Sequence, residues 1–342
     1  MRAKKLIRKN ILDLIPYSSA RDDFKSDKNF IYLDANESSY GNDLNRYPDN
    51  RHLKLIQLIC SYKGVNNDNL VLCNGTDELI DLVIRIFCKP GIDKIITLNP
   101  TYGMYDVSAK INDVENITIN LDTKFQIDSS KVISKFDSNT KIIFITNPNN
   151  PTGNIFDEKS IIKIIESFQG IVFIDEAYVD YSKKSFLKKI NKYDNLIISQ
   201  TFSKALGLAG IRLGIGYSNK DIIDYIKKVK PPYNINSLTE KKAINSISKY
   251  YVNSNQVNET IVERINLSEK LIKINSVKKV FPSNSNFILV EFNDANKIYQ
   301  QLIQNKIVVR NRSNVVGCSN CLRITVGTPE QNQLLIKTLK NL

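Results

Sequence analysis

The sequence predicts an α/β protein in which a large domain with a mostly parallel sheet between helices is followed by a smaller α+β domain. From about residue 68 to residue 217, short runs rich in Val, Ile and Leu alternate with longer amphipathic stretches. This alternation is typical of a mostly parallel sheet with helices on both faces. It stops at Pro231-Pro232, and a long helical pattern follows. The 342 residues are enough for one large domain and one smaller domain.

The expected strands of the large domain are short, mainly apolar runs, and most of them are rich in β-branched side chains. These runs span residues 70–73, 94–98, 117–120, 141–146, 170–174, 195–200 and 212–217. Amphipathic stretches at residues 77–88 and 158–168 are predicted to be helices between them. For the last third we expect a long helical region and three further strands, at residues 238–273, 286–291, 307–310 and 321–326.

The composition fits a globular enzyme and argues against several other classes of protein. Hydrophobic residues make up 42% of the chain and charged residues 24%, which is ordinary for a soluble enzyme. No apolar run approaches the roughly 20 residues that span a bilayer, and no secretory signal follows the basic N-terminus. We therefore expect a cytoplasmic protein with no membrane partner. The net charge of +13 comes from scattered lysines rather than one basic stripe, so no nucleic-acid partner is expected.

Cysteine and histidine offer little catalytic chemistry. Cys318 and Cys321 form a CxxC motif, but no second CxxC accompanies it, so no metal site is expected and both are interpreted as reduced, partly buried thiols. His52 is the only histidine of the chain and lies far from that motif in sequence. This isolation argues against a Ser-His-Asp or Cys-His mechanism.

Lys204 is the candidate catalytic residue. It stands between Ser203 and Ala205, shortly after the apolar run 196–198, which is an unusual place for a solvated lysine. A lysine that forms a Schiff base with a carbonyl cofactor needs such a position. Thr201, Ser203 and Arg212 would supply hydroxyls and a guanidinium for an anionic group such as phosphate.

Two further motifs follow predicted strands directly, where ligands collect in open α/β sheets. Asn74-Gly75-Thr76-Asp77 opens a helix, and its free backbone amides suit a phosphate, although an ordinary helix N-cap has the same pattern. Tyr102 follows the strand at residues 94–98. It could stack on a planar heteroaromatic ring, or it could be an ordinary aromatic residue at the rim of the sheet edge. The two interpretations have about equal support.

The loop at residues 147–153 and the segment around Asp175 are more informative. Prolines and a glycine restrict the loop, which would present the Asn150 amide to a phenolate-like oxygen. Asp175 ends the apolar strand and needs a cation, such as a pyridinium N–H, to remain charged there. Tyr178 could then donate to the ring hydroxyl oxygen. A metal-binding Asp-Glu pair is the alternative, but the chain has no GxxxxGK[ST] motif to accompany it.

In their order and spacing, these motifs resemble the fold-type I pyridoxal-phosphate aminotransferases, and within them the histidinol-phosphate aminotransferase family. The resemblance runs over nearly the whole chain. Its other specific marks are the segments at residues 14–17, 33–37, 45–49 and 322–327.

The resemblance implies a role for each residue around the cofactor, pyridoxal 5'-phosphate. Lys204 would hold the cofactor as a Schiff base and move a proton between the substrate and the cofactor. Asp175 would pair with the ring nitrogen, Tyr178 and Asn150 would bond the ring oxygen, and Tyr102 would stack on the ring.

The resemblance also assigns the remaining site residues. The cofactor phosphate would be held by Thr76, Asp77, Thr201, Ser203 and Arg212. Tyr47 would reach across a dimer interface to the phosphate bound by the partner subunit, so a homodimer is expected. The substrate would be bound by Tyr17, Asn36, Arg310 and Arg323.

The implied reaction is the reversible transfer of an amino group between L-glutamate and imidazole-acetol phosphate, which gives L-histidinol phosphate and 2-oxoglutarate. An aromatic amino-acid aminotransferase and an amino-acid phosphate decarboxylase are the alternatives on the same scaffold. The implied organisation is an N-terminal arm (1–33) that packs with the small domain or the partner subunit, a large cofactor-binding domain (34–232) and a small domain (233–342).

Overall fold

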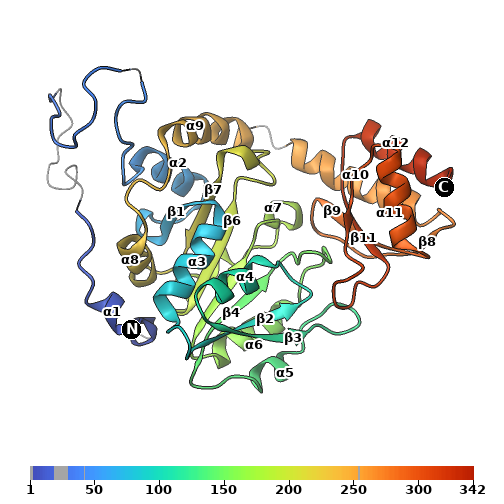
Figure 1. Ribbon diagram of the computed structural model, residues 1–342, viewed down its shortest axis with the longest axis horizontal. Coiled ribbons are helices and arrows are strands. Elements are labelled where there is room, and N and C mark those ends of the chain that lie inside the picture. The colour runs from blue at the N-terminus through green and yellow to red at the C-terminus, as the bar shows by residue number, and fades with distance from the viewer. Residues whose placement is uncertain (1–2, 19–29, 42, 253–254) are drawn as a thin grey trace.

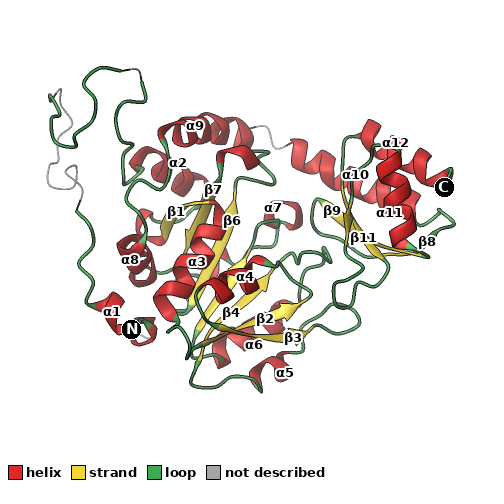
Figure 2. Cartoon of the chain, in the orientation of Figure 1, coloured by secondary structure: helices red, strands yellow, loops and turns green. Residues whose placement is uncertain are grey.

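The computed structural model describes residues 3–18, 30–41, 43–252 and 255–342. A seven-stranded sheet with helices on both faces forms the larger body, and a four-stranded sheet with α10, α11 and α12 forms the smaller one (Figure 1, Figure 2). Among the described residues, none of the helices combines the length and apolar character that a membrane crossing requires.

The large sheet has the strand order β1-β7-β6-β5-β4-β2-β3. Six strands run parallel, and β7 is antiparallel to both of its neighbours. All seven predicted strands are confirmed, each with ends within two residues of the prediction. They are β1 (Leu70–Asn74), β2 (Lys94–Asn99), β3 (Glu115–Asn120), β4 (Thr140–Thr146), β5 (Ile171–Asp175), β6 (Leu196–Thr201) and β7 (Leu213–Tyr217).

The strands are apolar on both sides because both faces of the sheet are covered. In β4, Ile143 and Ile145 belong to one buried cluster, whereas Ile142 and Phe144 belong to another. The first cluster is completed by α2 (Leu53–Lys63), α5 (Ser129–Ile133), α6 (Glu158–Ser167) and α9 (Ser237–Val252). The second is completed by α3 (Gly75–Phe87), α4 (Met104–Ile111) and α8 (Lys220–Val229). This two-sided burial is the reason for the near-continuous apolar runs in the sequence.

The N-terminal segment begins with the short helices η1 (Ala3–Leu6) and α1 (Lys9–Leu12). Ile7 and Ile11 are buried in the cluster that α3 and α8 complete, and the Arg8 amide donates to the Ile86 carbonyl at 3.0 Å. The start of the predicted arm therefore packs on the large body of its own chain and not on the small domain. Residues 1–2 and 19–29 of this arm lie outside the described residues, and its contact with a partner subunit stays a prediction.

The small sheet is antiparallel, with the order β10-β11-β9-β8. Its elements are α10 (Asn255–Leu271), β8 (Val277–Val280), β9 (Phe287–Phe292), α11 (Ala295–Gln304), β10 (Arg310–Asn311), β11 (Cys321–Thr325) and α12 (Pro329–Lys340). The predicted strand at residues 307–310 is wrong for residues 307–309, because only Arg310 and Asn311 pair with β11. The predicted helical region 238–273 is largely α9 and α10. The domain division at residues 232 and 233 stays a prediction.

Candidate active site

The topology of the large sheet brings the predicted motifs to one edge. The parallel strands β1, β4, β5 and β6 end there, at Asn74, Thr146, Asp175 and Thr201. Because β7 runs in the opposite direction, Arg212, which precedes β7, lies at the same edge. A cavity of about 480 Å³ opens at this edge.

The cavity collects twelve of the fifteen residues that the sequence predicted for the site. They are Thr76, Asp77, Tyr102, Asn150, Asp175, Tyr178, Thr201, Ser203, Lys204, Arg212, Arg310 and Arg323. Four lining residues were not predicted: Thr146, Ala177, Ala209 and Arg312. The set combines a lysine, a buried carboxylate and several guanidinium groups, which suits an anionic ligand that carries a carbonyl group and a cationic ring.

Asp175 is buried at the floor of this cavity, with only 3% of its surface exposed. Tyr105 Oη donates to its Oδ2 at 2.8 Å, while Ser199 Oγ and the Ala177 amide donate to its Oδ1 at 3.0 and 3.1 Å. Burial nevertheless raises the pKa of Asp175 above its usual value. A cation bound in the cavity next to Asp175 would favour the charged carboxylate.

The first turn of α3 and the start of β7 together form an anion cradle. Gly75 has a φ of +74°, and a Cβ atom on it would lie 2.7 Å from Arg212 Nη2. A Cβ atom on Gly214 would lie 2.5 Å from the Gly75 carbonyl carbon. Only glycine permits this close approach of the two backbones beside the guanidinium. The first amides of α3 have no partner within the helix, so with Arg212 they fit a phosphate.

Asp77 links two of the predicted cofactor residues. Tyr102 Oη donates to Asp77 Oδ1 at 3.0 Å, and Arg212 Nη2 lies 3.6 Å from Asp77 Oδ2. The hydroxyl of Thr201 accepts the Ser203 amide at 3.1 Å, so it helps to hold the loop that leads to Lys204. These contacts between protein groups hold the residues of the anion cradle in position.

Lys204 extends from the loop after β6 toward Tyr178, and its Nζ lies 5.7 Å from the centre of the Tyr178 ring. Burial lowers the pKa of Lys204, and the nearby Arg323 and Arg212 lower it further, against the opposing effect of Asp175. The residue is nevertheless accessible from the cavity. A lysine with a lowered pKa and an accessible nitrogen is suited to attack a carbonyl carbon.

Arg323 lies at the side of the cavity that the small sheet forms. Its guanidinium lies 5.2 Å from the centre of the Phe287 ring, and its Nη1 donates to Asn150 Oδ1. Arg310 is the neighbour of Arg323 across the β10–β11 pair. Burial raises the pKa of Tyr178 to about 12, so its hydroxyl stays protonated and remains able to donate.

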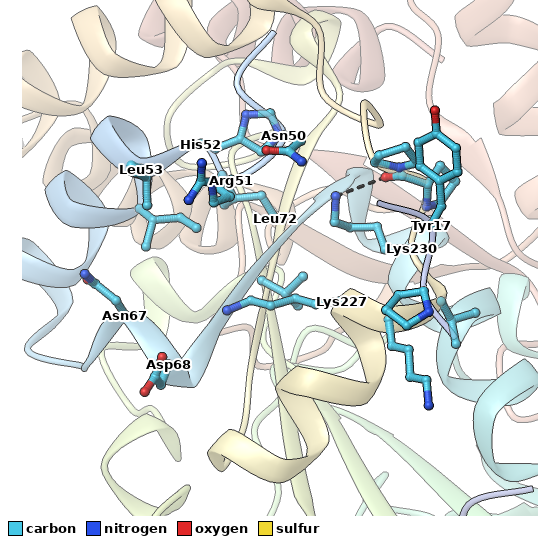
Figure 3. Close-up of a pocket in the computed structure, with 17 residues that line it drawn as sticks. Tyr17, Asn50, Arg51, His52, Leu53, Asn67, Asp68, Leu72, Lys227 and Lys230 are labelled. Atoms are coloured by element: carbon cyan, nitrogen blue, oxygen red, sulfur yellow. Dashed lines mark hydrogen bonds between the residues drawn. The ribbon is translucent and has the colours of Figure 1, made fainter. Parts of the chain in front are cut away.

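The other three predicted residues lie away from Lys204. Asn36 and Tyr47 line a second cavity, where Tyr47 stacks on Tyr233 with a ring separation of 4.5 Å. Tyr17 lies at the rim of a third cavity and is 74% exposed (Figure 3). Within this chain, none of the three lines the Lys204 cavity.

The third cavity is larger, at about 560 Å³, and also contains lysines. Figure 3 shows Lys227 and Lys230 in it. Lys230 Nζ already bonds the Pro231 carbonyl and Asn234 Oδ1. Among the described residues that line the cavity, the only acid is Asp68, which is exposed. His52 is buried against Glu240 Oε2 at 3.0 Å and does not line the Lys204 cavity. The Lys204 cavity is therefore the better candidate for carbonyl chemistry.

Sequence reasoning missed the residues that hold Asp175 in place. Thr146 and Ser199 are the register partners of Asp175 on the two neighbouring strands, and strand pairing is not visible in a single sequence. Tyr105 had a usable signal, since it lies only three residues after Tyr102, in the first turn of α4.

The cysteines supply no chemistry to this cavity. Cys318 and Cys321 are free thiols and fully buried, more deeply than the sequence suggested. Within the described part of the chain, no cluster of His, Cys, Asp and Glu has the arrangement of a metal site.

Residues 25–339 match the family described as aminotransferase class I and II. A histidinol-phosphate aminotransferase of Flavobacterium psychrophilum is 47% identical over 339 residues, which cover 98% of each chain. This protein belongs to the histidinol-phosphate aminotransferase family.

Solved structures agree with this family. The histidinol-phosphate aminotransferase from Clostridium acetobutylicum has a TM-score of 0.79 and 30% identity, and the match covers 87% of this chain and 91% of that one. The enzyme from Sinorhizobium meliloti, solved in complex with pyridoxal-5'-phosphate, has a TM-score of 0.81, 19% identity and coverage of 87% and 83%. The predicted fold class is confirmed.

We expect Lys204 to react with an aldehyde faster than other lysines do at neutral pH. Its lowered pKa leaves a larger unprotonated fraction than that of a solvated lysine, whose pKa is about 10.4. Bound cofactor is first removed with hydroxylamine; aldehyde treatment and borohydride reduction then precede peptide mapping over a pH series.

Lys220 is the internal control for this labelling, because Asp224 raises the pKa of this exposed lysine. The labelling rate of Lys204 should rise and level off at lower pH than that of Lys220. Equal rates at every pH would contradict the assigned environment of Lys204.

Proposed function

We propose that this enzyme transfers the amino group of L-glutamate to imidazole-acetol phosphate, giving 2-oxoglutarate and L-histidinol phosphate. The observation that carries the proposal is one cavity that holds Lys204, the buried Asp175 and three arginines with no carboxylate partner among the described residues. The full-length similarity to histidinol-phosphate aminotransferases supports the same reaction.

The cofactor is pyridoxal 5'-phosphate, and the residues present fit it. When bound, it supplies an aldehyde for a lysine and a cationic ring that withdraws electrons from the substrate's α-carbon. Lys204 would hold the aldehyde carbon, and Asp175 would pair with the ring nitrogen. Tyr102 would stack on the ring. Asn150 and Tyr178 would bond the ring oxygen.

The phosphate of the cofactor would lie in the cradle formed by α3 and β7. Thr76 and Ser203 offer hydroxyls, Arg212 offers a guanidinium, and the Asp77 carboxylate keeps Arg212 in place. The helix terminus adds favourable interactions with the negative charge. Thr201 contributes by positioning Ser203.

Lys204 would also move the proton in the reaction. A lysine with a lowered pKa has a larger neutral fraction than a solvated lysine, and its neutral nitrogen could remove the proton from the substrate's α-carbon and deliver it to the former aldehyde carbon of the cofactor. A charged Asp175 next to the ring nitrogen would favour the cationic form of the ring. The two reactions differ in the bond to the α-carbon that breaks: the bond to hydrogen in amino transfer, and the bond to the carboxylate carbon in decarboxylation.

Arg310 and Arg323 would bind the anionic end of each substrate. Glutamate presents carboxylates, whereas histidinol phosphate has a phosphate and no α-carboxylate. A guanidinium accepts both groups in a forked arrangement, so the same arginines serve both half-reactions.

A homodimer would bring the remaining residues to the site. Tyr47 is half exposed and Tyr17 is 74% exposed, and neither faces the cavity of its own chain. We propose that Tyr17, Asn36 and Tyr47 complete the site of the partner subunit. The cytoplasmic location stays a prediction.

The reaction is tested by assaying the purified enzyme with histidinol phosphate, phenylalanine and threonine phosphate as substrates. Histidinol phosphate with 2-oxoglutarate should give glutamate with the highest kcat/KM, because the arginines match its phosphate. Preference for phenylalanine would instead indicate an aromatic aminotransferase, and release of carbon dioxide from threonine phosphate would indicate a decarboxylase.

The matched control for this assay is Lys204→Ala. It removes the reacting nitrogen from an accessible side chain, so the protein should fold normally while both the visible absorbance of the lysine-bound cofactor and the activity are lost. Normal activity of this variant would show that another residue carries the chemistry.

The dimer is tested by co-expressing Lys204→Ala with Tyr47→Ala. If Tyr47 acts across the interface, each mixed dimer contains one site with both Lys204 and Tyr47. Random pairing then restores about a quarter of the wild-type activity, although each variant alone is weak. If dimers shown to contain one copy of each variant have no more activity than the single variants, Tyr47 does not act on the partner subunit.

A further inference from the structure

Four arginines line the Lys204 cavity: Arg212 on the side of the large sheet, and Arg310, Arg312 and Arg323 on the side of the small sheet. Arg310 and Arg312 are separated by one residue on an extended segment, so their side chains leave the same side of the chain. Both backbone groups of Arg312 are bonded. Its amide donates to the Cys321 carbonyl at 2.8 Å, and its carbonyl accepts the Val315 amide at 2.8 Å.

The turn that carries Arg312 is anchored to the large body. Cys318 is buried in a cluster with Phe125, which lies between β3 and α5. Gly317 has a φ of +73°, and a Cβ atom there would lie 3.1 Å from Phe125 Cε1. Glycine thus allows the turn to pack on the aromatic ring. Arg312 is therefore held at a fixed place in the cavity and is not a residue of a free loop.

Among the described residues, none is a counter-ion for the charge of Arg312. Its Nε is shielded from solvent without a hydrogen-bond partner, and no carboxylate in the described ranges forms an ion pair with Arg310, Arg312 or Arg323. Burial lowers the pKa of Arg312, and Arg323 and Arg310 lower it further. Such a cluster of like charges is costly unless an anion binds to it.

The two acids that line the cavity do not offset this cluster. Asp77 bonds Tyr102 and pairs with Arg212, while Asp175 accepts from Tyr105, Ser199 and the Ala177 amide. The excess positive charge therefore lies on the side of the small sheet, where the substrate's anionic end would bind.

We propose that Arg312 is a specificity-determining residue that binds the phosphate of the substrate and favours a phosphate monoester over a carboxylate. This inference rests on the proposed function. A carboxylate carries one negative charge, whereas a phosphate monoester carries about 1.5 to 2 at neutral pH. The third guanidinium matches this additional charge, and the two other arginines remain sufficient for glutamate.

The test compares Arg312→Gln with wild-type holoenzyme on histidinol phosphate, on histidinol, which lacks the phosphate, and on glutamate. Loss of one charge-assisted hydrogen-bonding group should lower the preference for histidinol phosphate over histidinol by roughly 10- to 100-fold. The kcat/KM for glutamate should change by less than about threefold. Arg312→Lys should restore part of the preference, because it restores the charge without the fork.

Arg85→Gln is the matched control, because Arg85 is an exposed arginine on α3 that pairs with Asp81 outside the cavity. It should leave the preference unchanged. A second readout does not need turnover: inorganic phosphate is titrated into the holoenzyme by calorimetry, and Arg312→Gln should weaken its binding by a similar factor.

The outcomes separate the two proposals. Unchanged phosphate affinity and unchanged preference in Arg312→Gln would overturn the role of Arg312. Equal losses for all three substrates with a lowered melting temperature would also overturn it, since they indicate a structural role only. If the wild-type enzyme does not act on histidinol phosphate, the proposed reaction is overturned. If Arg312→Gln then still weakens the binding of inorganic phosphate, Arg312 is supported as a phosphate ligand.

Discussion

The carboxylate of Asp175 is buried below the cavity, where an unpaired charge costs several kcal/mol even after relaxation. Three donors from α4, β6 and the chain after β5 offset part of this cost, yet burial still raises the pKa of Asp175. A cation on the cavity side would complete the arrangement. We propose that the cofactor's ring nitrogen is this cation, in which case binding of the cofactor and protonation of its ring would be coupled through Asp175.

The remaining parts of the site follow from the position of this carboxylate. The parallel strands bring Asp175 and Thr201 to the same sheet edge, and the loop after β6 then places Lys204 over the cavity. The reversed direction of β7 brings Arg212 to the same edge. In the proposed site, the large sheet would therefore supply the cofactor side, while the β10–β11 hairpin would supply the arginines of the substrate side. The proposed reaction would take place in the cavity that residues of both bodies line.

The sequence predicted those features that depend on local pattern. Runs such as 141–146 are apolar because both of their faces are buried, and loops such as 147–153 follow directly from the strand ends. Ser199 and Tyr105 could not be identified in this way, because their contact with Asp175 depends on strand register and on helix packing. Arg312 was missed because residues 307–310 were predicted to be the strand, whereas the pairing begins only at Arg310. The roles of Tyr17 and Tyr47 depend on a second chain and stay predictions.

The central claim is that Asp175 keeps the ring nitrogen of the cofactor protonated. The most direct measurement is the ¹⁵N chemical shift of the ring nitrogen in enzyme loaded with labelled cofactor, for the wild type and for Asp175→Asn. The variant keeps the size of the side chain but removes its charge. A protonated ring in the wild type and an unprotonated ring in the variant are the predicted results, with a drop in kcat of about 100-fold or more. A ring that is protonated in both proteins, or in neither, would contradict the account.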